Sequence, residues 1–376
     1  MSEPDPGADA AIASALFSPR RLRLARETRM MTRTALALAA GVTPAAVSQF
    51  ERGDARPVPQ TLLRLGGALA FPVMFFAVSA VPSSREAMPG EEHHDQGYFR
   101  SLRSIAVADR RRALALSHLI HDLADRLSHT VRLPDRDIPH HAVHAEADPA
   151  SAEDRADEIR AAWGIPPGPI PNVVLEMERR GVVCARYHAG THDVDAFSVP
   201  FPDLPVVVLG DDKAKRDRER FSAAHELGHL VMHDTRDAGS KAIEDQANRF
   251  AAAFLMPAAD IRTELPATAS WRELVILKKR WGASIGALLR RSRTLDVMSE
   301  ATYLQALRYM SGRGWRVDEP GDLGAGEAPR LLSLAASAAQ QAGLTIGALA
   351  SETGWPEPMI AEVLSASMDP RPRISF

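Results

Sequence analysis

Two histidines and a glutamate stand together in the segment His225-Glu226-Leu227-Gly228-His229. On a helix, residues four apart lie on one face, so both imidazoles can bind one metal ion while Glu226 points towards the open side of that ion. Zinc lowers the pKa of a bound water molecule to about 7, and a neighbouring carboxylate can accept its proton. The segment therefore predicts metal-assisted hydrolysis. The flanking residues are apolar, which favours a buried catalytic helix over a surface helix with two unliganded histidines.

A catalytic zinc ion needs a third protein ligand and one open position. His233 lies eight residues after His225, which is about 12 Å along a straight helix and too far to share the ion. Glu244 is the better candidate, because it begins a second predicted helix whose apolar stripe contains Ala247, Phe250, Ala251 and Phe254. On spacing alone, however, an acid in the first turn of a helix is more often a solvated side chain.

For other side chains that could take part in catalysis or metal binding, the sequence gives weaker support. A predicted strand is followed by three residues that could donate a hydrogen bond to an oxyanion: Tyr187, His188 and His192. Each of them is more often an ordinary strand or turn residue. A group with metal-ligand composition lies in a proline-punctuated segment, and we interpret it as a solvated loop: His140, His141, His144, Glu146 and Asp148. Cys184 lies within a predicted strand and is expected to be a buried apolar residue. A basic group is expected to form a solvated helix face: Lys278, Lys279, Arg280, Arg290, Arg291 and Arg293.

Residues 31–53 predict two short helices joined by a sharp turn. Thr32 is a suitable N-cap for the first helix, and Gly41 can adopt the left-handed conformation that ends it. Thr43 caps the second helix, and Pro44 stands at its first position, where a missing N–H group is harmless. Such a pair of helices fits the major groove of DNA, although a plain helical hairpin in a protein core has the same pattern.

The distribution of charge favours the DNA-binding interpretation. The chain has 376 residues, of which 45% are hydrophobic and 25% charged, and its net charge is −3. Residues 18–70 contain nine arginines and three acids, so their net charge is +6 and that of the rest of the chain is −9. A basic module joined to an acidic body is typical of a protein with one end that meets nucleic acid. The composition excludes collagenous, disordered and disulfide-rich classes, and the single cysteine suits a reducing cytoplasm.

Composition and periodicity divide the chain into five segments. We expect a disordered start (1–17), a helix-turn-helix domain (18–81), a linker with one long helix near 99–128 (82–148), a mixed domain with the metal motif (149–311) and a C-terminal helical module (312–376). Short strands near 182–187, 195–199 and 205–209 make the fold class mainly α with a small β-sheet (α+β). The tail repeats the pattern of cap and stop from Thr345 to Gly354, and its acidic residues favour contact with protein. The longest apolar stretch, residues 68–81, is too short to span a bilayer, so no membrane partner is expected.

The first motif, with its closing Glu51-Arg52-Gly53, resembles the DNA-binding domain of the phage-repressor-like (XRE) family. The resemblance implies that Arg33 lies near a DNA phosphate and that the duplex is also contacted by Thr43, Ala45, Ala46, Ser48 and Gln49. Alanine can touch only the methyl group of thymine, and Gln49 alone could pair with adenine through two hydrogen bonds, so base readout is expected to be sparse. Because repressor domains of this family usually bind as dimers, the resemblance also implies a homodimer.

The segment around the metal motif resembles the ImmA/IrrE family of metallopeptidases. The matching elements are His-Glu-Leu-Gly-His-Leu-x-x-His at 225–233 and Glu-x-x-Ala-Asn-x-Phe-Ala-Ala-x-x-Leu-Met-Pro at 244–257. The resemblance implies a zincin-like α+β domain in which His225, His229 and Glu244 bind zinc and Glu226 is the general base, with Mn²⁺ as the alternative metal. Such enzymes cut specific repressor proteins, often of the helix-turn-helix class, and so release transcription.

These features predict a cytoplasmic, DNA-binding transcriptional regulator fused to a zinc-dependent endopeptidase that cleaves a specific repressor or regulator protein. One alternative is a transcription factor whose metal-binding domain is a sensor or scaffold without turnover. The intact Glu226 argues against this alternative, because a purely structural site does not need a base. Another alternative is an enzyme that uses its helix-turn-helix domain only to recognise its substrate.

Overall fold

The chain forms two compact units. The computed structural model describes residues 6–77, 107–141, 143–144, 147–148, 150–187, 196–210, 215–233 and 240–366. The first unit, here called the helical unit, comprises residues 1–95, 105–133 and 330–376 as far as they are described. The second, here called the sheet unit, comprises residues 96–104 and 134–329 as far as they are described. The predicted linker and the predicted C-terminal module are therefore each divided between the two units.

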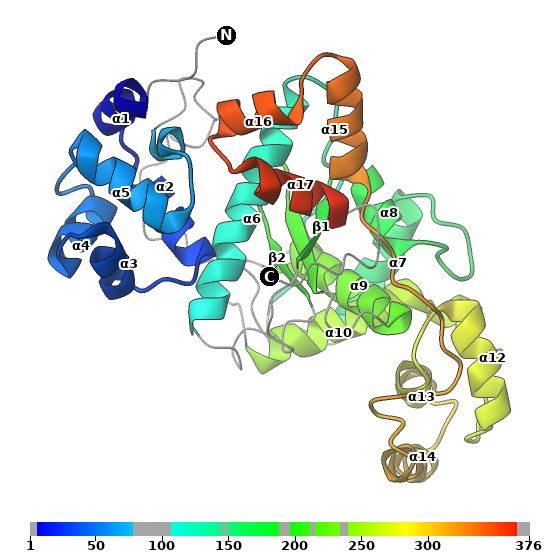
Figure 1. Cartoon of the computed structure of the whole chain (residues 1–376). Helices are drawn as coiled ribbons and strands as arrows, with labels where there is room; N and C mark the ends of the chain where they lie inside the picture. Colours follow the sequence, from blue (N-terminus) through cyan, green and yellow to red (C-terminus); the bar gives the residue numbers. More distant parts are fainter. Residues whose placement is uncertain are drawn as a thin grey trace. The chain divides into compact units, whose positions relative to one another are not determined.

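The N-terminal part of the helical unit is a compact group of short helices (Figure 1). It consists of α1 (Pro6–Ala15), α2 (Pro19–Thr28), α3 (Arg33–Ala40), α4 (Pro44–Arg52), α5 (Pro59–Leu69) and the short 3₁₀ helix η1 (Val73–Phe76). The prediction of a disordered start is wrong for residues 6–15, because they form α1, whose Ala10 and Ala13 are buried. The hydroxyl of Thr32 accepts the N–H of Ala35 at 3.0 Å, and Gly41 ends α3 in the left-handed conformation with φ 64°. Thr43 and Pro44 begin α4 in the same capped manner. The predicted helix-turn-helix is thus confirmed.

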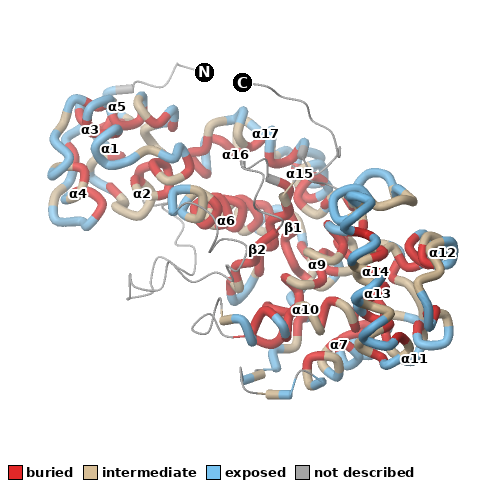
Figure 2. Tube along the Cα trace, turned by 90° about the horizontal axis from the view of Figure 1, so that it is seen from below, coloured by how far each residue is buried: buried red, intermediate tan, exposed pale blue. Residues whose placement is uncertain are grey.

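The rest of the helical unit is made by α6 (Val107–Ser128), α15 (Leu331–Gln341), α16 (Ile346–Thr353) and α17 (Glu357–Ala366). Figure 2 shows that α6 is largely buried. Thr345 caps α16, and Gly354 ends it with φ 71°. A Cβ atom at Gly354 would lie 2.5 Å from Cα of Phe75, and Arg21 donates hydrogen bonds to the carbonyl groups of Phe75 and Thr353. The C-terminal helices are therefore packed against the N-terminal helices of the same unit.

The sheet unit contains a small sheet with helices stacked beside it. Its described elements are α7 (Ala150–Ala162), α8 (Val173–Arg179), β1 (Val183–Tyr187), β2 (Ala196–Val199), β3 (Val206–Gly210), α9 (Arg216–Met232), α10 (Lys241–Leu255), α11 (Ala258–Ile261), α12 (Trp271–Trp281), α13 (Ile285–Thr294) and α14 (Glu300–Gly312). The strand order is β1-β3-β2, with β1 parallel and β2 antiparallel to β3. Helix α9 packs against β2 and β3, α10 packs on α9, and α7 packs on α10. The predicted fold class, mainly α with a small sheet, is confirmed.

Two residues of the predicted basic helix face are buried, so the prediction of a solvated face is wrong for them. Lys278 forms ion pairs with Asp217 at 2.7 Å and with Glu319 at 3.1 Å. Arg291 forms an ion pair with Glu153 at 2.6 Å and is only 1% exposed. These partners lie far away in the sequence, so the local charge pattern could not indicate them.

In the described part of the chain, no helix is long and apolar enough to cross a membrane.

The segment after α14, residues 313–329 and here called the strap, is fixed to the sheet unit by buried charges. Glu319 accepts hydrogen bonds from the N–H groups of Ile285 and Gly286 and so caps α13. Glu327 is 3% exposed, accepts the N–H groups of Val173 and Val174 at the start of α8, and forms an ion pair with Arg220 of α9. The strap thereby connects α8 and α13 with α9, the helix that carries the metal motif.

Candidate metal centre

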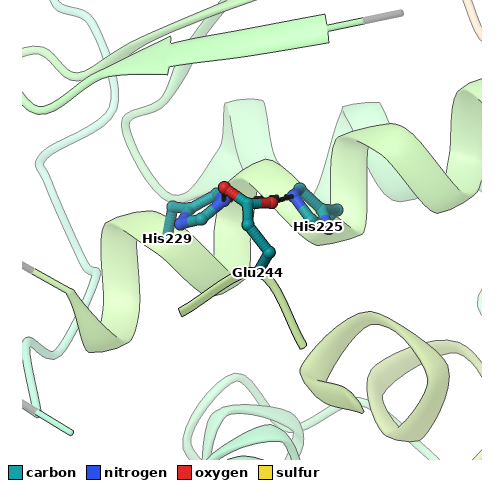
Figure 3. A group of neighbouring side chains, drawn as sticks. All are labelled: His225, His229 and Glu244. Carbon is teal, nitrogen blue, oxygen red and sulfur yellow. Dashed lines mark hydrogen bonds and ion pairs between the residues drawn. The ribbon is translucent and has the colours of Figure 1, made fainter. Parts of the chain in front are cut away.

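Two helices of the sheet unit bring three potential metal ligands to one point (Figure 3). His225 and His229 project from α9, and Glu244 reaches both from the first turn of α10. Oε2 of Glu244 is 3.3 Å from Nε2 of His225, Oε1 is 3.8 Å from Nε2 of His229, and the two Nε2 atoms are 3.0 Å apart. Within the described ranges, this is the only group of three or more His, Cys, Asp or Glu residues close enough to hold a metal ion.

Local features of the sequence explain why Glu244 reaches the two histidines. The hydroxyl of Ser240 accepts the N–H of Ile243 at 3.2 Å, so α10 begins at Lys241 and Glu244 falls in its first turn. Helix α10 crosses α9 at Gly228, where an added Cβ atom would lie 3.0 Å from Cδ1 of Phe250. The missing side chain at Gly228 therefore allows the close approach that brings Glu244 to the histidines.

Replacement of Gly228 by alanine should weaken metal binding. The new methyl group would push Phe250, and α10 with it, away from α9 by a few tenths of an ångström. We expect the zinc affinity, measured by competition with a chelator, to fall about tenfold, although alanine favours helix by about 1 kcal/mol. Gly67→Ala in α5 is the control, because its Cβ atom would meet nothing within 4 Å. An unchanged zinc affinity of Gly228→Ala would contradict this account of helix spacing.

Hydrogen bonds hold the outer nitrogen atoms of both histidines. Nδ1 of His225 lies 3.1 Å from Oδ1 of Asn248, and Nδ1 of His229 lies 3.0 Å from Nδ1 of His233. The Nε2 atoms of both rings are therefore the ones that face Glu244 and each other. Two imidazole nitrogens and one carboxylate are a common ligand set of catalytic zinc, with a further position for water or substrate. The donor set thus fits a catalytic metal ion.

The electrostatics of His229 and Glu244 favour metal binding, whereas those of His225 favour its protonated form in the absence of a metal ion. Burial lowers the pKa of His229 to about 3, which keeps this imidazole neutral. Burial alone would raise the pKa of Glu244, but its interactions with the rings of His225 and His229 outweigh burial and hold this pKa at about 2. The pKa of His225 is raised, since burial is outweighed by the hydrogen bond and the charges of Glu244 and Glu226. Neutral imidazole and ionised carboxylate are the forms that bind a metal ion.

Glu226 lies beside the three potential ligands and is held by a residue of the sheet. The hydroxyl of Ser198, a buried residue of β2, donates a hydrogen bond of 2.6 Å to Oε2 of Glu226. Burial raises the pKa of Glu226 to about 7, against the lowering effects of His225 and Ser198. A fixed carboxyl group with a pKa near neutrality is suited to accept and release a proton.

A cleft of about 720 Å³ opens beside the candidate metal centre, within the sheet unit. His225, Glu226 and Glu244 form part of its lining. Other parts of the lining come from the start of α9, from α14 and from the strap: Lys215, Arg218, Phe221, Leu307, Met310, Arg316 and Val317. The buried cluster of Lys278 with Asp217 and Glu319 also borders the cleft. A protein segment could therefore approach Glu226 along a wall with both charged and apolar groups.

The other residues considered for a chemical role in the sequence lie outside the candidate metal centre or outside the described residues. His188, His192 and Glu146 lie outside the described residues, as does the side chain of Tyr187. The three described histidines of the proline-punctuated segment are exposed and belong to no metal group among the described residues: His140, His141 and His144. Cys184 is fully buried in β1, where burial raises the pKa of its thiol well above the ordinary value. His233 is not one of the three potential ligands, in agreement with the prediction, but it does not continue the helix as that prediction assumed, because α9 ends at Met232.

The residues predicted to meet DNA lie on α3, on α4 and at the cap between them. Five of them are fully or partly exposed: Thr43, Ala45, Ala46, Ser48 and Gln49. Arg33 begins α3, has a side chain that is 47% exposed, and forms an ion pair with the buried Glu51 at 2.7 Å. Glu51 also binds Arg26, so this acid of the closing motif orients Arg33 from the core of the unit.

Four residues that support the site were not predicted from the sequence. Ser198 and Lys278 act on partners 28 and 61 residues away in the chain, Glu226 and Asp217, so no local pattern could reveal them. Asn248 and Gln246 lie on α10 close to Glu244, and there a signal existed. Residues four apart share a helix face, so Asn248 could have been expected beside Glu244 and its histidine partner.

Comparison with known protein families agrees with both parts of this description. Residues 177–293 match the family model of the IrrE N-terminal-like domain, which contains the three potential ligands and Glu226. Residues 22–73 match a helix-turn-helix family model, which contains α3 and α4. No curated protein matches the chain.

Proposed function

Since the chain carries an IrrE-like metallopeptidase domain and an XRE-type helix-turn-helix domain, we propose that it is a zinc-dependent endopeptidase joined to a DNA-binding transcriptional regulator. The observation that supports this most strongly is that Glu226 shares one cleft with His225 and Glu244. We propose that His225, His229 and Glu244 bind Zn²⁺, with Mn²⁺ as the alternative metal.

The proposed reaction is hydrolysis of a peptide bond in a protein substrate. When bound, zinc would supply a Lewis acid that activates a water molecule. Glu226 accepts a proton from the attacking water as its oxygen bonds to the carbonyl carbon, and it returns a proton to the leaving nitrogen as the C–N bond breaks. Ser198 holds Oε2 of Glu226 and so fixes the carboxyl group that exchanges the proton.

We propose that the substrate is a specific repressor or regulator protein, itself of the helix-turn-helix class. This substrate class follows from the family resemblance. The cleft of about 720 Å³ supports a substrate of this kind, because it has room for a protein segment and is lined by both basic and apolar residues, among them Arg218, Arg316 and Leu307. We place the protein in the cytoplasm, where its DNA and its substrate would both be present. The comparisons do not support a homodimer, so the proposal does not include one.

The test is to incubate the purified full-length protein, loaded with zinc or manganese, with repressor proteins encoded nearby. Glu226→Gln is the matched variant, because glutamine keeps the shape of the side chain and an oxygen for Ser198 but cannot accept the proton. We expect cleavage by the wild-type protein, cleavage slower by about 10²- to 10⁴-fold for the variant, and none after chelation. Identical fragment patterns and rates from both proteins would contradict the peptidase proposal and favour a sensor without turnover.

Arg33→Ala should weaken DNA binding at every sequence. If Arg33 contacts a phosphate, its loss removes one ionic contact, and the slope of log affinity against log salt concentration should become shallower by about 1. The measurement is a fluorescence anisotropy titration of a random-sequence duplex at several salt concentrations. Arg126→Ala is the control, since Arg126 lies on α6 and is ion-paired with Glu352. An unchanged salt slope for Arg33→Ala would contradict the assigned contact.

A further inference from the structure

A chain of hydrogen bonds leads from the backbone to the candidate ligand His229. Nε2 of Gln246 donates to the carbonyl oxygen of His144 at 2.8 Å. Oε1 of Gln246 lies 3.0 Å from Nε2 of His233, and Nδ1 of His233 lies 3.0 Å from Nδ1 of His229. Gln246 and His233 are each only 2% exposed. Neither side chain has a part in the proposed reaction.

The end of α9 places His233 in this chain. The helix ends at Met232, and His233 follows it in an extended conformation with φ −118° and ψ 145°. The His144 end is fixed by the backbone, because the N–H groups of His141 and Val143 donate to the carbonyl groups of Val231 and Met232 at 2.8 Å each. Both ends of the hydrogen-bond chain are therefore attached to the last turn of α9.

The chemistry of the groups gives the hydrogen-bond chain one direction. A backbone carbonyl can only accept, so the amide nitrogen of Gln246 must face His144, and its oxygen then faces His233. His233 donates from Nε2 to that oxygen, and in its neutral form its Nδ1 is an acceptor. His229 must then donate from Nδ1, which leaves the lone pair on its Nε2 towards Glu244 and His225.

We propose that His233 and Gln246 are positioning residues that hold His229 in the one tautomer that can bind the metal through Nε2. This inference rests on the proposed metal site and assigns a role to the last histidine of the motif, which is not one of the three potential ligands. His225 obtains the same control from a single acceptor, Oδ1 of Asn248. Outer partners of this kind fix the orientation and tautomer of a ligating histidine.

The first test needs no substitution. Nitrogen-15 NMR of the imidazole groups in the metal-free, full-length protein distinguishes protonated from unprotonated ring nitrogens. We expect the proton of His229 on Nδ1. A proton on Nε2 of His229 would overturn the proposal, whatever the effect of any variant.

The second test uses two variants and a control, with zinc affinity measured by competition with a chelator. His233→Phe keeps the ring but removes both nitrogens, and Gln246→Leu removes the acceptor. We expect each to lower zinc affinity about 10- to 100-fold and to give His229 a mixture of tautomers, while His141→Phe, at an exposed site, has the affinity of the wild-type protein.

The outcomes separate this inference from the proposed function. If the wild-type protein does not bind zinc, the proposed metal site fails. If the wild-type protein binds zinc and both variants match its affinity and its His229 tautomer, the positioning role is overturned while the metal site stands. Lower affinity with an unchanged His229 tautomer would also overturn it, because that result indicates a role in packing alone.

Discussion

Replacing Glu244 with alanine should remove most of the zinc affinity of the protein, with hydrolysis lost in parallel. The carboxylate is 1% exposed and faces the Nε2 atoms of His225 and His229 at 3.3 and 3.8 Å. Without it, two imidazoles remain where a catalytic zinc ion needs three protein ligands. Loss of an outer-shell partner costs about 10- to 100-fold in affinity, so we expect more than 100-fold for loss of a direct ligand.

The metal content of dialysed protein, together with chelator competition, measures this effect. Asp245→Asn is the matched control, because Asp245 is the exposed acid next to Glu244 on the same helix turn. We expect this control to keep the metal and the wild-type rate. Full zinc occupancy in Glu244→Ala would mean that another residue completes the site.

Replacing Glu327 with alanine should cause a large loss of stability in the sheet unit. Glu327 is ion-paired with Arg220, whose side chain is 3% exposed, and it accepts two N–H groups at the start of α8. Removing one partner of a buried ion pair leaves an uncompensated charge, which costs about 3 to 5 kcal/mol. Because Arg220 lies on α9, the variant should also release zinc at a lower denaturant concentration.

Urea unfolding, followed by tryptophan fluorescence and by zinc release, measures this loss. Asp318→Asn is the control on the same strap, since Asp318 is 87% exposed and its ion pair with Lys215 lies in solvent. Exposed ion pairs add little to stability, so this control should unfold close to the wild-type protein. A Glu327→Ala protein as stable as the control would show that the strap is not anchored by this charge.

Local sequence signals were sufficient to predict several helices and the three strands of the described structure. Thr32 and Gly41 mark the start and the end of α3, and Thr345 and Gly354 mark those of α16. Such signals are local, because caps and left-handed glycines act within one helical turn. The three strands were predicted within one or two residues of β1, β2 and β3. The two histidines of α9 share a face for the same local reason. None of these predictions needed knowledge of tertiary contacts.

The supporting interactions depend on contacts between distant segments, which local patterns do not contain. On spacing alone, Glu244 was predicted to be a solvated acid, and only the family resemblance favoured it as a metal ligand. The sequence predicts Lys278 on a solvated helix face, yet it is buried between Asp217 and Glu319. In the sequence, Ser198 is a single polar residue in a predicted strand, and only the fold brings it into contact with Glu226. The packing of the C-terminal helices with α6 likewise joins segments about 200 residues apart.

The central claim is that Glu226 and the three ligands together hydrolyse a peptide bond in a protein. Its most direct measurement is mass spectrometry of substrate fragments formed in H₂¹⁸O by the zinc-loaded wild-type protein and by Glu226→Gln. We expect the wild-type protein to form one new carboxyl terminus that carries ¹⁸O, and the variant to form the same terminus about 10²- to 10⁴-fold more slowly. An ¹⁸O-labelled terminus formed equally by both proteins, or fragments without ¹⁸O, would contradict the claim.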